Sequence, residues 1–221
     1  MKNRVLFATT LAGALLCALP NVTMAQSDPG NSQGDQGAGR DFDLFSTTFT
    51  NNSILPISTI HNIIYMGKNV CSINGSAGGN MSPELSWTGT PPRTRTFVVV
   101  LFDATGSFTH WGMYNIAGYR TGLLENAGAP GSPYGMQIVN DVSGAAGYDG
   151  PCPPPNYPPN VHHYVFTVYA LDMELNLGSP NYPVTGPAPL YYALIGAALN
   201  HHILASASLT GLYTTTPGAS N

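Results

Sequence analysis

The sequence GYDGPCPPPNYPPNVHHYVFTVYALD, residues 147–172, changes character near its midpoint. Its first half is rich in glycine and proline, which favour turns and loops. From Val161 onward, β-branched and aromatic residues predominate without a glycine or proline, which is typical of a β-strand. Side chains alternate between the two faces of a strand, so His162 and Tyr164 should point to the same side. We therefore expect an imidazole and a phenol to face one point beside a loop, an arrangement suited to a small anion.

A second decisive stretch is TFVVVLFD, residues 96–103. Apolar side chains occupy both of its faces, which indicates a central strand that is covered on both sides. Asp103 ends this strand on the same face as Phe97. His110 begins the next strand-like segment, residues 110–116, after a short connection. Asp103 and His110 can therefore approach each other.

The remaining pattern is mostly that of short strands. Residues 85–87 and 203–213 are predicted strands, and residues 190–200 are a predicted helix with prolines near its start. In residues 57–66 we expect Ile60, Ile63, Ile64 and Tyr65 to pack inward. Many strands, little helix and no regular alternation of the two predict a mainly β, sandwich-like domain with one late helix.

The composition favours an exported protein. Only 8% of the 221 residues are charged, against about 25% in an average soluble domain. Residues 1–25 have the basic start, apolar run and small-residue end of a secretory signal peptide, and no later stretch approaches the ~20 apolar residues of a membrane span. We expect a periplasmic or secreted protein without a transmembrane anchor. Its few lysines and arginines exclude a nucleic-acid binder.

The chain should divide into four parts. After the signal peptide, residues 26–41 form a Gly/Gln-rich segment that cannot bury enough apolar surface to fold, and we predict a disordered linker. Residues 42–214 form the folded domain. Residues 215–221 are predicted to be a flexible tail.

Two cysteines, Cys71 and Cys152, remain after the signal peptide. An oxidising compartment favours a disulfide between them. Such a bridge closes a loop of about 80 residues and would contribute roughly 4 kcal/mol; the alternative is two buried free thiols. The cysteine and histidine spacings are not those of a zinc site, so we expect no metal and no cofactor.

Several tracts together resemble the phosphatidylethanolamine-binding protein family, most closely its bacterial, Raf-kinase-inhibitor-like branch. They occur in the family's order between about Phe45 and Tyr213. These tracts are NMSPELSW at 80–87, the strand that ends at Asp103, HW at 110–111 with Asn115 beyond it, GYDGPCPP at 147–154, HHY at 162–164 followed by FTVYAL, and HILASASLTGLY at 202–213.

The resemblance implies an antiparallel Greek-key β-sandwich with a few short peripheral helices, one of them near the C-terminus. It also implies a small pocket that takes phosphate, acetate or a phosphorylated headgroup. At the matching positions the ligand-binding groups are Asp103, His110, backbone amides near Gly150, His162 and Tyr164. Phe108 and Trp111 are candidate walls of this pocket.

The sequence departs from the family pattern beside the pocket. The family's D-P-D-x-P segment is here DATGS, residues 103–107, which lacks the second acidic residue and both prolines. The usual arginine between the pocket histidine and tyrosine is His163. The resemblance therefore implies a pocket that keeps its outline but has a less acidic rim, and it leaves the ligand preference open.

The chemistry of these residues suits an oxyanion. Two imidazoles, a phenol and backbone N–H groups can donate hydrogen bonds to phosphate. Asp103 can accept a hydrogen bond from an imidazole and favour its protonated form. We therefore expect phosphate affinity to fall as the pH rises from about 6 to 8.

The sequence supports an exported, non-enzymatic binding protein with an anion pocket, a regulatory, kinase-inhibitor-like role and a protein partner. One alternative is a hydrolase that uses the Asp/His cluster for acid–base chemistry; no nucleophile motif supports it, and Ser107 is the nearest hydroxyl. Another is a surface protein that interacts through its Asn/Thr-rich loops. His162 and Tyr164 also fit an ordinary strand whose polar tips bond the backbone. The natural ligand and the oligomeric state stay open.

Overall fold

The computed structural model describes residues 41–177 and 186–219, all within the unit formed by residues 39–221. The predicted signal peptide and all but the last residue of the predicted linker lie outside the described residues. Within the described ranges, no helix is both long enough and apolar enough to cross a bilayer.

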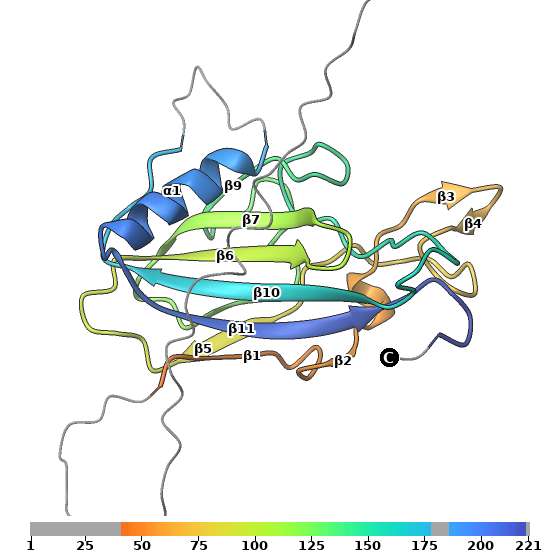
Figure 1. Cartoon of the computed structure of the whole chain (residues 1–221), viewed down its shortest axis with the longest axis horizontal. Coiled ribbons are helices and arrows are strands. Elements are labelled where there is room, and N and C mark those ends of the chain that lie inside the picture. Colours follow the sequence, from red (N-terminus) through yellow and green to blue (C-terminus); the bar gives the residue numbers. More distant parts are fainter. Residues whose placement is uncertain (1–40, 178–185, 220–221) are drawn as a thin grey trace, which may run out of the picture. The chain divides into compact units, whose positions relative to one another are not determined.

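A six-stranded sheet forms the centre of the fold (Figure 1). Its neighbouring strands are antiparallel, except that β2 pairs with β11 in parallel. In spatial order the strands are β2 (Ser53–Ile54), β11 (Ile203–Tyr213), β10 (His162–Leu171), β6 (Thr96–Asp103), β7 (Phe108–Ala117) and β9 (Met136–Gln137).

Two smaller sheets, one α-helix and one 3-10 turn complete the described elements. A three-stranded sheet has the order β1 (Asp43–Phe45), β5 (Leu85–Thr88) and β8 (Gly122–Leu123). A separate hairpin consists of β3 (Ile64–Tyr65) and β4 (Lys68–Asn69), the 3-10 turn η2 spans Ile57–Thr59, and helix α1 spans Ala188–Leu199.

The main hydrophobic core lies between the three-stranded sheet and the six-stranded sheet. Trp87 of β5 packs on Phe97 of β6 with ring centroids 4.9 Å apart. Helix α1 covers the other face of the large sheet, where Leu190 lies so close to Gly112 of β7 that a Cβ there would be 2.8 Å from its side chain. Both faces of β6 are therefore covered, as its continuous apolar sequence predicts.

The mainly β fold class is confirmed. Strands β6 and β11 have the predicted bounds, and α1 begins two residues before the predicted start. One packing prediction is wrong: Ile60 is fully buried, but Ile63, Ile64 and Tyr65 are 42%, 57% and 67% exposed. They belong to the β3–β4 region, which stands outside the large sheet (Figure 1), and no sheet face is available to cover them.

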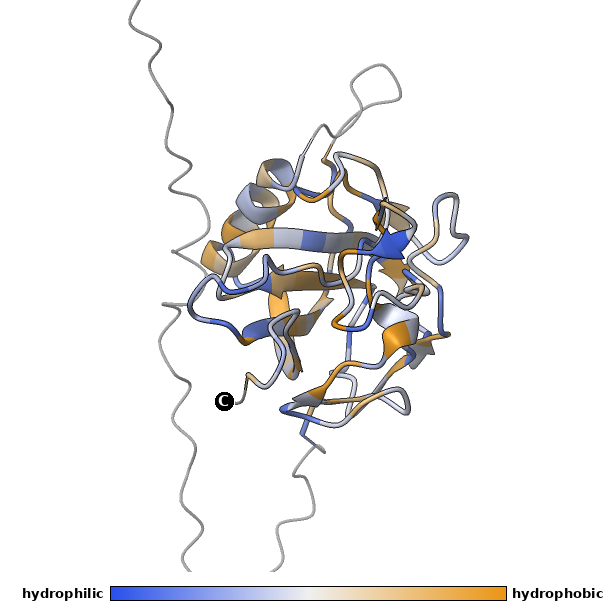
Figure 2. Ribbon diagram, turned by 90° about the vertical axis from the view of Figure 1, so that its right-hand side faces the viewer, coloured by the Kyte–Doolittle hydropathy of each residue, from blue (hydrophilic) through white to orange (hydrophobic). Residues whose placement is uncertain are grey.

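Figure 2, which is coloured by hydropathy, shows hydrophobic residues on loops outside the central strands as well as in them. The hairpin accounts for part of this. It turns at Met66 and Gly67, whose φ angles are 49° and 76°. Met66, at the tip, is 86% exposed.

Two long-range contacts hold the loops beside the sheet. Cys71 and Cys152 form a disulfide across 81 residues of sequence. Thr215 is buried, and its hydroxyl donates to the carbonyl of Pro153 at 2.6 Å. The predicted flexible tail is therefore wrong at its start, since the packed chain continues past residue 214.

Candidate functional site

The register of β6 and β10 brings Asp103 and Tyr164 directly opposite each other. His162 lies two residues before Tyr164 and so shares its face. The Nδ1 atom of His162 is 2.6 Å from Oδ2 of Asp103, and both side chains are almost entirely buried. Parity predicted that His162 and Tyr164 share a face, whereas the pairing of β6 with β10 brings Asp103 to them.

Asp103 also closes the turn that follows β6. Its Oδ1 accepts hydrogen bonds from the amides of Thr105 at 2.9 Å and Gly106 at 2.8 Å. Burial works to raise the pKa of Asp103, but the hydrogen bonds from His162 and Gly106 outweigh it and hold the pKa below its usual value. Asp103 is therefore an ionised carboxylate that is fully engaged by the protein.

His110 reaches the cluster because β7 contains a bulge. Trp111 pairs with Leu101 and Thr109 with Phe102, so His110 is an extra residue without a partner on β6. Its ring meets the ring of Tyr164 edge to face, with centroids 5.2 Å apart. Strict alternation of faces does not anticipate this position.

A backbone carbonyl holds the imidazole of His110. Its Nδ1 lies 2.9 Å from the carbonyl oxygen of Asp149, and the Asp149 amide donates back to the carbonyl of His110 at 3.1 Å. A carbonyl only accepts, so Nδ1 carries the proton. Burial lowers the pKa of His110 and outweighs the opposing effects of the Asp149 carbonyl and the nearby carboxylates. The neutral ring is therefore favoured.

These hydrogen bonds define which atoms a ligand can use. In His162, as in His110, Nδ1 donates to an oxygen, and no described side chain bonds Nε2 of either ring. A neutral ring of this tautomer offers a lone pair at Nε2, whereas a protonated ring offers an N–H donor.

The hydroxyl of Tyr164 is buried near the Asp103 carboxylate, but no described residue lies close enough to accept a full hydrogen bond from it. Burial, followed by the nearby Asp103 carboxylate, raises the pKa of Tyr164, so the group stays a donor. Buried polar groups are nearly always paired, because an unpaired one costs about 1–3 kcal/mol. An acceptor from a ligand would satisfy this hydroxyl.

The structure contradicts the predicted role of the Gly150 amide. That N–H donates to Oδ1 of Asn80 at 2.7 Å, and so it is not available to an anion. A Cβ at this position would lie 2.0 Å from the carbonyl oxygen of Thr59. Glycine is therefore required here for the close approach of two chain segments.

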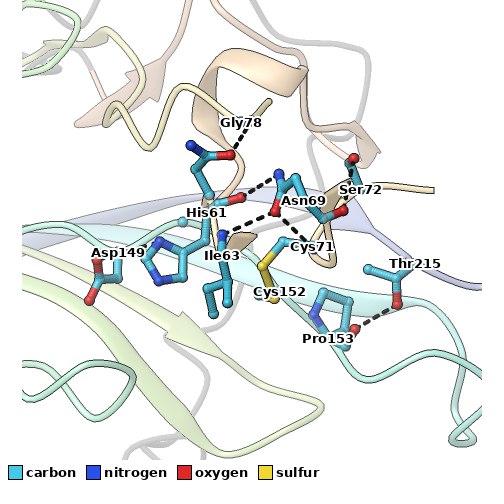
Figure 3. Close-up of a disulfide and its surroundings, with 12 residues drawn as sticks. His61, Ile63, Asn69, Cys71, Ser72, Gly78, Asp149, Cys152, Pro153 and Thr215 are labelled. Atoms are coloured by element: carbon cyan, nitrogen blue, oxygen red, sulfur yellow. Dashed lines mark hydrogen bonds and ion pairs between the residues drawn. A yellow bond between two sulfur atoms is a disulfide. The ribbon is translucent and has the colours of Figure 1, made fainter. Parts of the chain in front are cut away.

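Asp149 is the centre of a buried polar network. Its carboxylate accepts hydrogen bonds from Nδ2 of Asn80 at 3.2 Å, Nδ2 of Asn140 at 2.9 Å and the hydroxyl of Ser143. The ring of His61 faces it, with Nδ1 3.7 Å from Oδ1 (Figure 3). Asn140 and Ser143 lie within nine positions of Asp149, whereas Asn80 is 69 positions away, so the sequence alone does not show that they converge.

The two residues predicted to line the pocket, Phe108 and Trp111, differ in how exposed they are. Phe108 is half-exposed, and its ring lies next to Gly106 in the turn after Asp103. Trp111 is fully buried, donates from Nε1 to Gln137 at 2.8 Å and packs against Tyr148. Phe108 therefore lies at the rim, whereas Trp111 supports the cluster from the core.

The cluster itself is nearly closed to solvent. His110 is 5% exposed and His162 is 6% exposed, while Tyr164 is completely covered. The small exposed part of the cluster therefore belongs to the two imidazoles. In the part of the chain that the structure describes, no group of three His, Cys, Asp or Glu residues could hold a metal ion.

Comparison with known sequences agrees with this geometry. The phosphatidylethanolamine-binding protein family model matches residues 45–214. A UPF0098 protein of Methanothermobacter thermautotrophicus is 39% identical over 141 residues, which cover 62% of this chain and 84% of that protein. The UPF0098 protein YbcL of Escherichia coli K12 is 37% identical over 146 residues, which cover 63% of this chain and 74% of YbcL.

Solved structures extend the similarity to the fold. The crystal structure of E. coli YbcL, described as a new member of the mammalian PEBP family, matches with a TM-score of 0.59 and 31% identity over 79% of this chain and 98% of YbcL. CT736 of Chlamydia trachomatis, a putative phosphatidylethanolamine-binding protein homologue, matches with a TM-score of 0.56 and 26% identity over 78% and 97% of the two chains. The chain belongs to the phosphatidylethanolamine-binding protein family.

Proposed function

We propose that this protein is an exported, non-enzymatic binding protein whose cluster of Asp103, His110, His162 and Tyr164 takes a phosphate group. The phosphate is either free or part of a phosphorylated headgroup. The observation that carries the proposal is the buried hydroxyl of Tyr164, a donor without a partner among the described residues. Two Nε2 atoms without a described partner lie on the imidazoles beside it.

Proton uptake links the site to pH. A phosphate oxygen can accept from Tyr164 in either protonation state of the histidines, but it gains charge-assisted donors only when His110 or His162 is protonated. The ionised Asp103 carboxylate, 2.6 Å from His162, can pair with a protonated ring. Phosphate affinity should therefore fall as the pH rises from about 6 to 8.

The hydrolase alternative has less support. Nucleophilic catalysis needs a hydroxyl or thiol paired with a base. Within residues 41–177 and 186–219, no serine, threonine or cysteine bonds to a ring nitrogen of His110 or His162; the bonded ring atoms are Nδ1 of His162, on the Asp103 carboxylate, and Nδ1 of His110, on the Asp149 carbonyl. We therefore place a regulatory role, with a protein partner, ahead of turnover.

The test compares two buried tyrosines by calorimetric titration with inorganic phosphate at pH 6. Tyr164→Phe should weaken phosphate binding about tenfold or more, since it removes a donor to a charged group. Its free energy of unfolding should stay the same or rise by up to about 1 kcal/mol, because an unpaired group is removed. A merely structural tyrosine would not lose binding while gaining stability.

Tyr213→Phe is the matched control. The hydroxyl of Tyr213 already donates to the carbonyl of Cys71 at 3.0 Å. This variant should lose about 1 kcal/mol of stability and keep its phosphate affinity. Equal affinities for wild type and Tyr164→Phe would refute the proposal. Parallel titration with glycerophosphoethanolamine distinguishes a headgroup, which should bind more tightly, from free phosphate.

A further inference from the structure

A second site lies at the opposite end of the large sheet. A cavity of about 530 Å³ is lined by Glu84, Tyr119, Arg120, Leu123, Leu124 and Tyr134, among others. Asp103 pairs with Phe108 at one end of the β6–β7 ladder, and Thr96 pairs with Ala117 at the other. Arg120 follows Ala117, so the length of the ladder, roughly 23 Å, separates this cavity from the histidine cluster.

Arg120 presents an unpaired cation in this cavity. Its guanidinium carbon lies 4.4 Å from the ring centre of Tyr134 and 5.7 Å from that of Tyr119. No hydrogen bond or ion pair joins the Arg120 side chain to any other residue in the described part of the chain. The aromatic rings orient the guanidinium and cover part of its surface, while its N–H donors stay available for an oxyanion.

The backbone around Arg120 is held firmly. Its amide donates to the carbonyl of Ala117 at 3.0 Å, and its carbonyl accepts from Nε1 of Trp87 at 2.9 Å. Trp87 is a fully buried core residue. The cation is therefore attached to a rigid part of the fold, which lowers the entropic cost of binding a ligand.

Glu84 limits the kind of anion that fits. Its carboxylate lines the same cavity and accepts hydrogen bonds from the amide and hydroxyl of Thr47, at 2.7 and 2.9 Å, and from the hydroxyl of Ser86. Its negative charge opposes a doubly charged phosphate more than a singly charged carboxylate. Leu124, which is 68% exposed, adds apolar surface.

We infer that this cavity binds a small monocarboxylate with an apolar or aromatic body. Arg120 would bind the carboxylate through a bidentate hydrogen bond, and the side chains of Tyr119, Tyr134 and Leu124 would cover the apolar part of the ligand. This inference does not depend on the phosphate site, because the two sites share no residue.

The experiment uses phenylacetate as the probe and NMR of the two indole N–H groups as the readout. The protein has two tryptophans, of which Trp87 bonds Arg120 and Trp111 bonds Gln137. Titration across the millimolar range should shift the Trp87 signal in a saturable way and leave that of Trp111 in place. Arg120→Gln should weaken phenylacetate binding at least tenfold. Arg120→Lys should weaken it several-fold, because lysine keeps the charge but lacks the planar guanidinium that binds a carboxylate with two hydrogen bonds.

Matched variants separate this site from others. Arg95→Gln removes an exposed arginine outside the cavity, whose guanidinium lies 3.8 Å from the Glu174 carboxylate. This variant should leave phenylacetate binding unchanged. His162→Gln should also bind phenylacetate normally, even if it loses phosphate. Unsaturable or absent shifts, an affinity that is equal in Arg120→Gln, or a loss of binding in His162→Gln but not in Arg120→Gln would each overturn the inference.

Discussion

The two histidines of the proposed phosphate site are held by two aspartates in different ways. Asp103 accepts from His162 through its carboxylate, whereas Asp149 accepts from His110 through its backbone carbonyl. The Asp149 carboxylate instead faces Asn80, Asn140, Ser143 and His61. One imidazole therefore lies against a negative charge and the other against a dipole.

This difference gives the two rings separate tasks. Nδ1 of His162 bonds a charged acceptor, the Asp103 carboxylate, at 2.6 Å. Burial lowers the pKa of His110 and favours its neutral form. Residues of the same type, a few ångströms from the same tyrosine, thus differ in chemistry because of the partner atom that each contacts.

The largest expected effect comes from releasing the segment around Asp149, which holds His110. Cys152 follows Asp149 by three residues and is bonded to Cys71. Replacing both cysteines by alanine should lower the free energy of unfolding by about 4 kcal/mol, because the unfolded chain is no longer constrained by a long closed loop. Urea denaturation measures this loss.

The same change should affect the two histidines unequally. In the double variant, the ring signals of His110 should move more in NMR spectra than those of His162, which is bonded within the β6–β10 pair. Reduced wild type should resemble the variant. A stability loss below about 1 kcal/mol would show that the disulfide does not stabilise the segment around Asp149.

The second-largest expected effect comes from removing the contact between Asp103 and His162. Asp103→Asn removes one partner of a buried ion pair and should cost about 3 kcal/mol of unfolding free energy at pH 7. Because the folded-state pKa of Asp103 is below its unfolded value of 3.8, the advantage of wild type is complete well above pH 4. It should shrink as the pH falls through the folded-state pKa. Urea denaturation as a function of pH checks both expectations.

Asp172→Asn is the control for that variant. Asp172 pairs with His202 at 2.8 Å, but their side chains are 22% and 43% exposed. An accessible pair of this kind contributes about 0–1 kcal/mol. Equal losses in the two variants would contradict the importance of burial at Asp103.

The smallest expected effect concerns the charge of His110. Its pKa is lower in the folded state than the usual 6.5, so its contribution to stability is complete above about pH 6.5 and declines as the pH falls through the folded-state pKa. Between pH 7 and 5, wild type should lose about 1 kcal/mol more stability than His110→Gln. Parallel pH profiles of the two proteins would contradict a neutral His110.

Local sequence patterns predicted much of the site. Alternation along one strand put His162 and Tyr164 on the same face, since period-two alternation is a property of each strand alone. The grouping of Asp103 with them was implied by the family resemblance, and the register of β6 and β10 places Asp103 opposite Tyr164. His110 was identified from its place after a short connection and from the family resemblance. The bulge that turns it toward Tyr164 appears only in the pairing of β6 with β7.

Other features depend on residues that are distant in sequence. The bond between the Gly150 amide and Asn80 spans 70 positions, and the contact of Asn80 with Asp149 spans 69. Neither leaves a periodic trace in the sequence. The family resemblance implied that the Gly150 amide binds an anion, whereas this amide donates to Asn80 within the protein.

By itself, the sequence determined the mainly β fold, the bounds of its central strands and the residues that share a face, because backbone preference and alternation act over neighbouring positions. Tertiary structure alone decided which of those side chains keep free donors and which apolar residues stay exposed on the β3–β4 hairpin. Burial and hydrogen-bond partners depend on which distant segments lie nearby, and that information is not local to any stretch of the chain.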